Sequence, residues 1–248
     1  MYSSRSRKRV YASRSRSKTP ARPSKYYKKS RAITKRSYAK SLASAKGVGL
    51  ANGLQTQLKT VIFYSATAVG PTGVWTGFLK SGSCFDPTGS LSNIQPAEFD
   101  QWSALFGRYV VTGGSVKVTV MPGRAATGTD ANTNANFVAC MYPDIDATPK
   151  ADYQAAASQD WSVKGIGGQG MRPVVLYQKF SHAALLGKKG CVTSEDNGAL
   201  VTADPTANQF INHNLFIQAA RPGSYEYTVH VEIIQDVYFD RRVTVDTE

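Results

Sequence analysis

The stretch SYEYTVHVEIIQDVYF, residues 224–239, is the most informative part of the sequence about the fold. From Tyr225 to Ile233 every second residue is apolar, and the residues between them are Glu, Thr, His and Glu. This period of two is typical of a β-strand with one buried and one exposed face. We therefore expect a long, half-buried strand in this part of the chain.

Short runs rich in β-branched and aromatic residues, separated by Gly, Pro, Asn and Asp, occupy most of the preceding sequence. Such runs predict strands. Gly113-Gly114 interrupts one of them and predicts a bulge or bend. Two stretches, 97–106 and 150–158, can form one or two helical turns each. The further candidate strands are 58–68, 73–80, 108–121, 135–142, 173–181, 183–187 and 213–220.

About eight strands with long loops in one body predict an all-β fold, either a two-sheet sandwich or a jelly roll of two packed antiparallel sheets. The sequence has no internal repeat at a fixed spacing. A propeller or a solenoid is therefore not expected. No run of 18 apolar residues is present either, so we expect no membrane insertion.

The charge of the chain is concentrated at its beginning. The whole sequence has 30 Lys and Arg against 17 Asp and Glu, but residues 1–46 hold 16 basic residues and no acidic one. The remaining residues therefore carry a net charge of −3. A segment with so little apolar surface and so much like charge is expected to be disordered on its own. We divide the chain into an arm (1–46), a hinge (47–57) and a folded body (58–248).

The arm is predicted to bind nucleic acid. Lys and Arg neutralise phosphates with little dependence on sequence, and tyrosines between them can stack on unpaired bases. A merely solvated tail does not require sixteen positive charges, and a mitochondrial transit peptide needs an amphipathic face that this arm lacks. The expected contacts are Arg5, Arg7, Lys8, Arg9, Arg14, Arg16, Lys18, Arg22, Lys25, Tyr26, Tyr27, Lys28, Lys29, Arg31, Lys35 and Arg36. Clustered basic residues also serve as nuclear localisation signals, here Arg5, Arg7, Lys8, Arg9, Lys28 and Lys29.

The sequence offers no catalytic or metal-binding pattern, and we expect neither an enzyme nor a cofactor. Its three histidines, His182, His213 and His230, each stand without a second ligand at metal spacing, and His230 falls on the polar face of its strand. Asp144 and Asp146 lie between prolines and are interpreted as loop residues.

GIGGQG, residues 165–170, matches the dinucleotide-binding pattern. It is followed by Pro173 and an apolar run, however, and not by the helix that this pattern needs, so it is interpreted as a flexible loop. Cys84, Cys140 and Cys191 are odd in number and far apart, which favours small buried thiols in a reducing compartment. The N-terminal residues have no apolar stretch behind their charges, so a secretory signal is not expected.

A basic arm before a single all-β body resembles the capsid proteins of circular Rep-encoding single-stranded DNA viruses, the circovirus-like group. EFDQWSALFGRYVVTGGSVKVTVMP (98–122) is similar to an aromatic loop and a Y-x-V-x-G-x-x-V strand of that family. KFSHAALLGKK (179–189) is similar to its strand, Ser, small apolar turn and Gly-Lys segment, and the strand at 224–239 is the third element. The arm departs from many circoviruses in being richer in Ser, which leaves the genus open.

This resemblance implies an eight-stranded jelly roll and sixty copies in a T=1 icosahedral shell, with the arm facing a packaged single-stranded DNA genome. It further implies host import receptors as partners, and location in the virion and, during assembly, in the host nucleus. Two other functions stay open: the coat protein of a small RNA or satellite virus, and a cellular nucleic-acid-binding β protein with a basic tail. A jelly-roll enzyme is not expected, because it would need a His/Glu cluster that three scattered histidines cannot supply.

Overall fold

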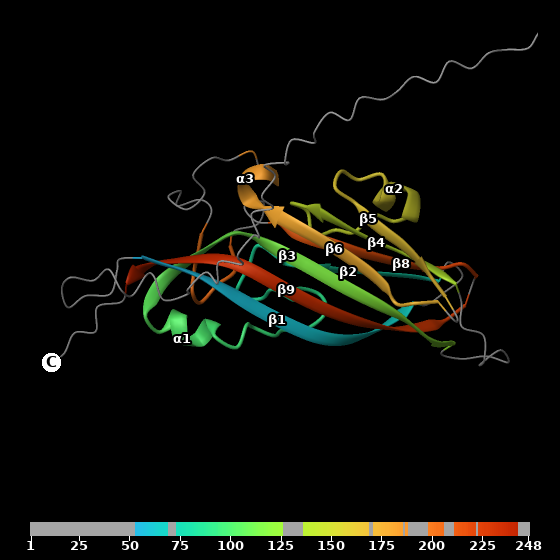
Figure 1. The fold of residues 1–248 in the computed structure, drawn as a ribbon, viewed down its shortest axis with the longest axis horizontal. Helices are drawn as coiled ribbons and strands as arrows, with labels where there is room; N and C mark the ends of the chain where they lie inside the picture. Colours follow the sequence, from blue (N-terminus) through green and yellow to red (C-terminus); the bar gives the residue numbers. More distant parts are fainter. Residues whose placement is uncertain are drawn as a thin grey trace, which may run out of the picture. The chain divides into compact units, whose positions relative to one another are not determined.

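A computed structural model of the chain describes residues 53–68, 73–125, 136–168, 171–185, 187, 198–205, 211–221 and 223–242. These residues form nine strands and three short helices (Figure 1). The strands are β1 (Gly53–Ala68), β2 (Val74–Leu79), β3 (Phe106–Ala125), β4 (Phe137–Asp144), β5 (Val163–Gly167), β6 (Val174–Ser181), β7 (Ala199–Leu200), β8 (Asn212–Ala219) and β9 (Tyr225–Arg242). The helices are α1 (Phe99–Ser103), α2 (Tyr153–Ala157) and α3 (His182–Leu185).

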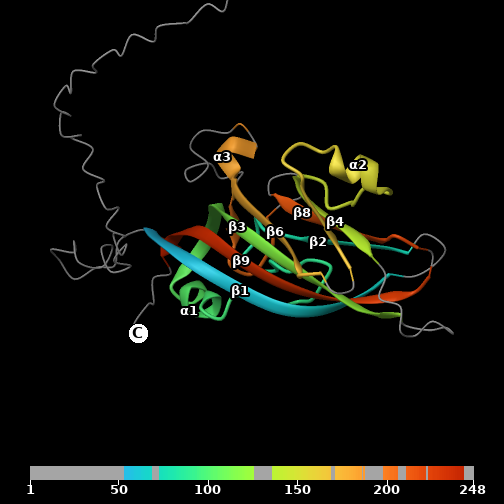
Figure 2. The same cartoon turned by 45° about the vertical axis from the view of Figure 1, so that its right-hand side comes forward.

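The strands form two antiparallel sheets. One has the order β1-β9-β3-β6, with the short β7 also beside β3, and the other has the order β2-β8-β4-β5 (Figures 1 and 2). With β7 set aside, the first strand pairs with the eighth, the second with the seventh, the third with the sixth and the fourth with the fifth. This is the pairing of one long hairpin rolled into two sheets, the jelly roll. The predicted all-β fold is confirmed.

The core lies between the two sheets and follows the alternation seen in the sequence. In β9, Val229, Val231 and Ile233 are fully buried, and the residues between them face away from the core. Leu58 and Ile62 of β1 continue the same buried surface. At one end, an aromatic cluster forms around Phe239; its other members are Phe99, Trp102 and Phe106.

β3 lies between β9 and β6, and two glycines at its predicted bulge allow the backbones of these strands to approach it closely. The register between β3 and β9 shifts between Val111 and Gly113, so Thr112 is an extra residue there, and the predicted bulge is confirmed. A side chain at Gly114 would overlap the carbonyl oxygen of Ile234, and one at Gly113 would lie 2.7 Å from the carbonyl oxygen of Phe180. Glycine is therefore needed at both positions because the backbones approach too closely for a Cβ atom.

Two local predictions are wrong. Residues 183–187 were expected to form a strand, but His182–Leu185 form α3. Ala and Leu are strong helix formers, and the turn ends near Gly187, which has a φ of 64°.

GIGGQG was expected to be a flexible loop, but its first residues belong to β5, paired with β4. Gly165 and Gly167 lie on the inward face of β5, where a Cβ atom would collide with Val174 and Phe137 respectively. The strand was hidden from sequence analysis because its inward positions carry almost no side chains. The next described element is the strand β6, so no described helix follows the motif.

The predicted hinge at 47–57 is wrong in its second half, because β1 begins at Gly53. Leu54 and Leu58 are buried, and Gln57 Nε2 donates a 2.7 Å hydrogen bond to Asp236 Oδ1 in β9. Glutamines on the outward positions masked this alternation, because they carry neither charge nor β-branching. Residues 47–52 lie outside the described residues.

Removing residues 1–46 is expected to leave the free energy of unfolding within about 0.5 kcal/mol of the full chain, since no described strand is shortened. Removing residues 1–58 deletes two buried leucines and should cost about 3–6 kcal/mol. Urea denaturation of the three proteins measures both effects. Loss of a cooperative transition on removal of 1–46 would show that the body begins earlier than β1.

Candidate functional site

All the predicted nucleic-acid contacts, and with them the nuclear-import residues, lie in residues 1–46, outside the described residues. What the structure describes is the body to which this arm is joined. Its first strand, β1, starts at Gly53 and is hydrogen-bonded to β9. In the described sheet β1 stands at the end of the strand order, so the arm is joined to an edge strand.

The outer face of the sheet β1-β9-β3-β6 is formed by residues that alternate with the core residues of these strands. Antiparallel register aligns them in three rows across the sheet. From β1 to β6 the rows are Lys59, Ile234, Ser115 and Lys179; then Val61, Glu232, Lys117 and Tyr177; then Phe63, His230, Thr119 and Val175. We refer to these twelve residues as the outer face.

The charges of the outer face are mainly positive. The carboxylate of Glu232 lies 2.5 Å from Lys59 Nζ and 3.7 Å from Lys117 Nζ. The hydrogen bond from Lys59, reinforced by the charge of Lys117, lowers the pKa of Glu232. One carboxylate is therefore shared by two lysines, and with the exposed Lys179 the twelve residues hold three lysines and one acidic group.

Apolar and aromatic side chains stand among these charges. The Phe63 side chain is 73% exposed, and its ring is stacked on the His230 imidazole with 4.4 Å between centroids and 27° between planes. Val61, Val175 and Tyr177 are about half exposed on the same face. Sequence analysis missed Phe63 because apolar Ile62, Phe63 and Tyr64 follow one another. Its position does identify it: Phe63 lies four residues after Lys59 and therefore on the same exposed face of the strand, whereas the buried Leu58 lies on the opposite face.

A partly buried polar network lies elsewhere, in the loop after β2. Lys80 Nζ donates to Asp86 Oδ2 at 2.8 Å and to Asp204 Oδ2 at 2.7 Å, and Ser83 Oγ donates to Asp204 Oδ1 at 2.6 Å. Burial alone lowers the pKa of Lys80, but the bonds to the two carboxylates outweigh it and the net shift is upward. Gln235 Nε2 donates to the carbonyl oxygens of Ser81 and Ser83 at 2.8 and 2.6 Å. The ammonium group of Lys80 occupies the position between Asp86 and Asp204 that a metal cation would otherwise take. The network therefore anchors the loop.

The histidines are not all isolated, contrary to prediction. His182 and His213 are both buried and close enough for their charges to interact, and each ring packs edge-on against Phe180. His213 Nδ1 lies 2.6 Å from Ser81 Oγ, which donates its one proton to the Ile211 carbonyl at 2.9 Å. Among the described residues, Nε2 of His213 is buried without a hydrogen-bond partner. This Ser-His contact is fully buried and offers no access to a substrate.

The remaining predicted positions have structural surroundings. Asp146 lies in a loop as predicted, and its Oδ1 accepts from the Thr148 amide at 2.9 Å. For Asp144 the loop prediction is wrong, because it is the last residue of β4 and pairs with Asn212; its Oδ1 accepts from the Asp146 amide at 3.2 Å. Cys84 and Cys140 are buried free thiols, and burial raises the pKa of Cys140 to about 11. Cys191 lies outside the described residues.

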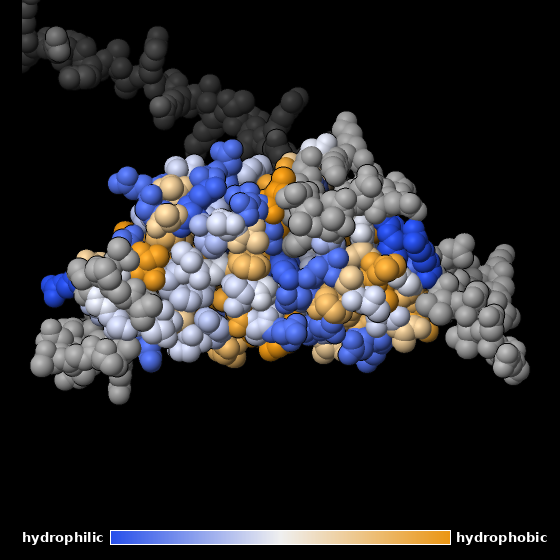
Figure 3. Space-filling model, turned by 180° about the vertical axis from the view of Figure 1, so that it is seen from behind, coloured by the Kyte–Doolittle hydropathy of each residue, from blue (hydrophilic) through white to orange (hydrophobic). Residues whose placement is uncertain are grey.

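Within the described part of the chain, no group of three or more His, Cys, Asp and Glu is arranged to hold a metal ion. Among the described helices, none is long and apolar enough to cross a membrane. On the face seen from behind, described hydrophobic residues lie in small groups separated by hydrophilic ones (Figure 3).

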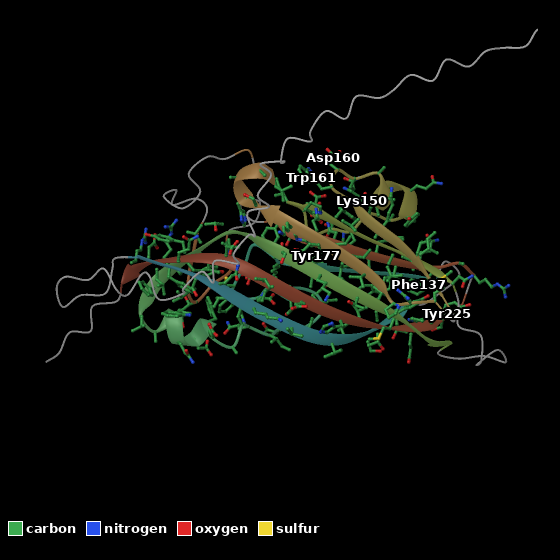
Figure 4. The ribbon with its side chains drawn as sticks, viewed as in Figure 1. Phe137, Lys150, Asp160, Trp161, Tyr177 and Tyr225 are labelled. Carbon is green, nitrogen blue, oxygen red and sulfur yellow. The ribbon has the colours of Figure 1, made fainter. Side chains whose placement is uncertain are left out.

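The position of Tyr177, one of the residues of the outer face, can be seen in Figure 4, where it lies on β6. Asp160 and Trp161, also labelled there, lie in the connection from α2 to β5.

The comparisons with known proteins gave structural matches. No protein-family model matches the sequence, and a search of curated proteins gives no match. Among similar solved structures is a semi-empty virus-like particle of the giant freshwater prawn Macrobrachium rosenbergii nodavirus, with 10% identity, a TM-score of 0.44 and coverage of 81% of this chain and 100% of that chain. The Penaeus monodon metallodensovirus capsid has 12% identity, a TM-score of 0.38 and coverage of 79% and 77%. Cocksfoot mottle virus has 9% identity, a TM-score of 0.39 and coverage of 77% and 96%.

Proposed function

We propose that this chain is a viral capsid protein that self-assembles into a small icosahedral shell and packages single-stranded DNA through residues 1–46. One observation carries the proposal: sixteen basic and no acidic residues precede a jelly roll whose own sequence is mildly acidic. The jelly roll is a fold of capsids, lectins and cupins. The basic arm favours a capsid protein over a lectin or a cupin, because neither sugar binding nor cupin chemistry requires such a polycation.

The separation of charge supports different roles for the two parts of the chain, with nucleic-acid binding in the arm and shell formation in the body. Nucleic-acid-binding domains usually extend their basic surface over the fold, whereas here the body has 14 basic and 17 acidic residues. Phosphate neutralisation is therefore assigned to the arm. With sixty copies, sixteen charges per arm would neutralise about 960 phosphates. The same clusters, at Arg5–Arg9 and around Lys28, are proposed to serve nuclear import.

Assembly of the full chain at low salt is expected to increase at least tenfold when single-stranded DNA is added, because confined arms repel one another without a polyanion. A variant with Gln at all sixteen basic positions of residues 1–46 should assemble equally with and without DNA. A second variant, with the same arm residues in scrambled order, should behave as the wild type because the binding is independent of sequence. Electron microscopy and sedimentation give the particle yield. Equal yields for the wild type and the Gln variant, with and without DNA, would contradict packaging by the arm.

Particles purified from infected cells distinguish a packaged DNA from a packaged RNA. After removal of external nucleic acid, the protected strand is digested with DNase or with RNase once the shell has been opened. DNase-sensitive content in particles from infected cells is expected. RNase-sensitive content would favour the coat protein of a small RNA or satellite virus, whose arm would work by the same phosphate chemistry.

A further inference from the structure

We propose that the outer face of the sheet β1-β9-β3-β6 is a second site for single-stranded nucleic acid, in which an unpaired base stacks on Phe63. The inference rests on the proposed function, since it takes the nucleic acid to be the one bound by the arm. It adds a site on the folded body, for which the sequence analysis predicted no nucleic-acid contact.

The geometry of Phe63 is that of a stacking platform. His230 stacks against the Phe63 ring at 4.4 Å and 27°, which holds the plane of the ring, while 73% of the side chain is exposed to solvent. Tyr177 is 48% exposed on the same face, three strands away, at roughly 14 Å from β1 by the usual strand spacing. Aromatic side chains on a sheet surface bind successive unpaired bases in this way, with little preference for sequence.

The charges around the platform are complementary to phosphate. Lys59 lies two rows from Phe63 on the same strand, and Lys117 and Lys179 lie across the sheet. Glu232, the acidic member of the outer face, is already engaged by Lys59 and Lys117. Within these three rows a strand would therefore meet three lysines and one carboxylate. Two further carboxylates of β9 face the same side: Asp236, one row beyond Lys59 and hydrogen-bonded to Gln57, and Glu226, two rows beyond Phe63.

The position of β1 in the chain joins the arm directly to this sheet. Residues 1–46 lead into β1 at Gly53, and Phe63 lies in the middle of that strand. A polyanion bound by the arm is thus tethered close to the outer face, and its local concentration there is raised to about the millimolar range. A weak stacking site is sufficient under these conditions.

The test measures binding of two fluorescent probes to the full chain, a 20-nucleotide oligothymidylate and an abasic strand of the same length and charge. Phe63→Ala is expected to weaken oligothymidylate binding about 5–10-fold and to leave abasic binding unchanged. Phe63→Trp, which keeps a ring, should restore the difference between the probes. Leu200→Ala removes an apolar side chain, 56% exposed, from β7 and should change neither affinity.

Photo-crosslinking with a bromouracil-substituted strand locates the contact. Trypsin cleaves after Lys59 and Lys80, so residues 60–80 form one peptide that contains Phe63. A crosslink in this peptide, lost in Phe63→Ala, is the expected result. Crosslinks confined to residues 1–46, or equal effects of Phe63→Ala on both probes, would overturn the inference and leave the arm's function intact. Failure of the wild type to bind either probe would overturn both. A Phe63→Ala variant that assembles poorly but discriminates the probes normally would assign this face to contact with a second copy of the chain.

Discussion

Acidification from pH 6.5 to pH 3.5 is expected to lower the free energy of unfolding of the body by about 3.5 kcal/mol through His213 alone. Burial, assisted by the neighbouring His182, lowers the pKa of His213 to about 3 from its ordinary 6.5. The folded chain therefore keeps this imidazole neutral in a range where the unfolded chain binds a proton. The stabilisation is complete above pH 6.5 and decreases by about 1.4 kcal/mol per pH unit as the pH falls towards 3.

The contribution of His213 is isolated by comparison with His213→Phe, which retains a ring beside Phe180 but does not titrate. Urea denaturation of both proteins at pH 7.0, 6.0, 5.0 and 4.0 gives the difference in their unfolding free energies. At pH 7.0 this difference reports the packing cost of the substitution. Below pH 6.5 the difference should shift in favour of the variant by about 1.4 kcal/mol per unit. A difference that does not change with pH would mean that water or a proton reaches this site in the folded state.

Phe239→Ala is expected to cost about 3–5 kcal/mol of unfolding free energy. The Phe239 ring is fully buried, and its centroid lies 6.2 Å from that of Phe99, 6.4 Å from that of Trp102 and 6.0 Å from that of Phe106. Truncation would leave a cavity where α1, β3 and β9 meet, because the strands around it are fixed by their own hydrogen bonds.

Phe239→Leu provides the matched control, since it keeps most of the apolar volume and should cost less than half as much. Urea denaturation at pH 7 measures both variants, and the slope of the transition should stay constant if the same surface is exposed on unfolding. A loss below about 1 kcal/mol for Phe239→Ala would show that α1 collapses into the cavity and that this end of the sandwich is not rigid.

The fold was predictable wherever one face of a strand is apolar and the other polar. The alternation in β9 and the double glycine of β3 were both interpreted correctly. Prediction failed where an element lacks side chains on its inward face, as in β5, or where short apolar runs are ambiguous, as in α3. In β5 the deciding interaction is the pairing with β4, whereas in α3 it is the local helix propensity of Ala and Leu.

The candidate sites divide along the same line. The composition of the arm is a local property, so its predicted chemistry required no structure. The outer face and the buried histidine pair are products of register and topology. Lys59, Glu232 and Lys117 come from three different strands, and His182 meets His213 only because β6 and β8 lie in sheets packed face to face. The spacing of these residues in the sequence could not have predicted these contacts.

The pairing of β1 with β9 has a consequence for how the chain folds during synthesis. Ala68 pairs with Tyr225, and β9 also lies between β1 and β3, so the centre of that sheet is the last strand to leave the ribosome. At about 5–20 residues per second, β1 waits roughly 8–30 s for its partner. Long-range pairing of this kind is slow and leaves apolar edges open meanwhile. Residues 1–46 precede β1, so under the proposed function they would be available to a polyanion before the body is complete.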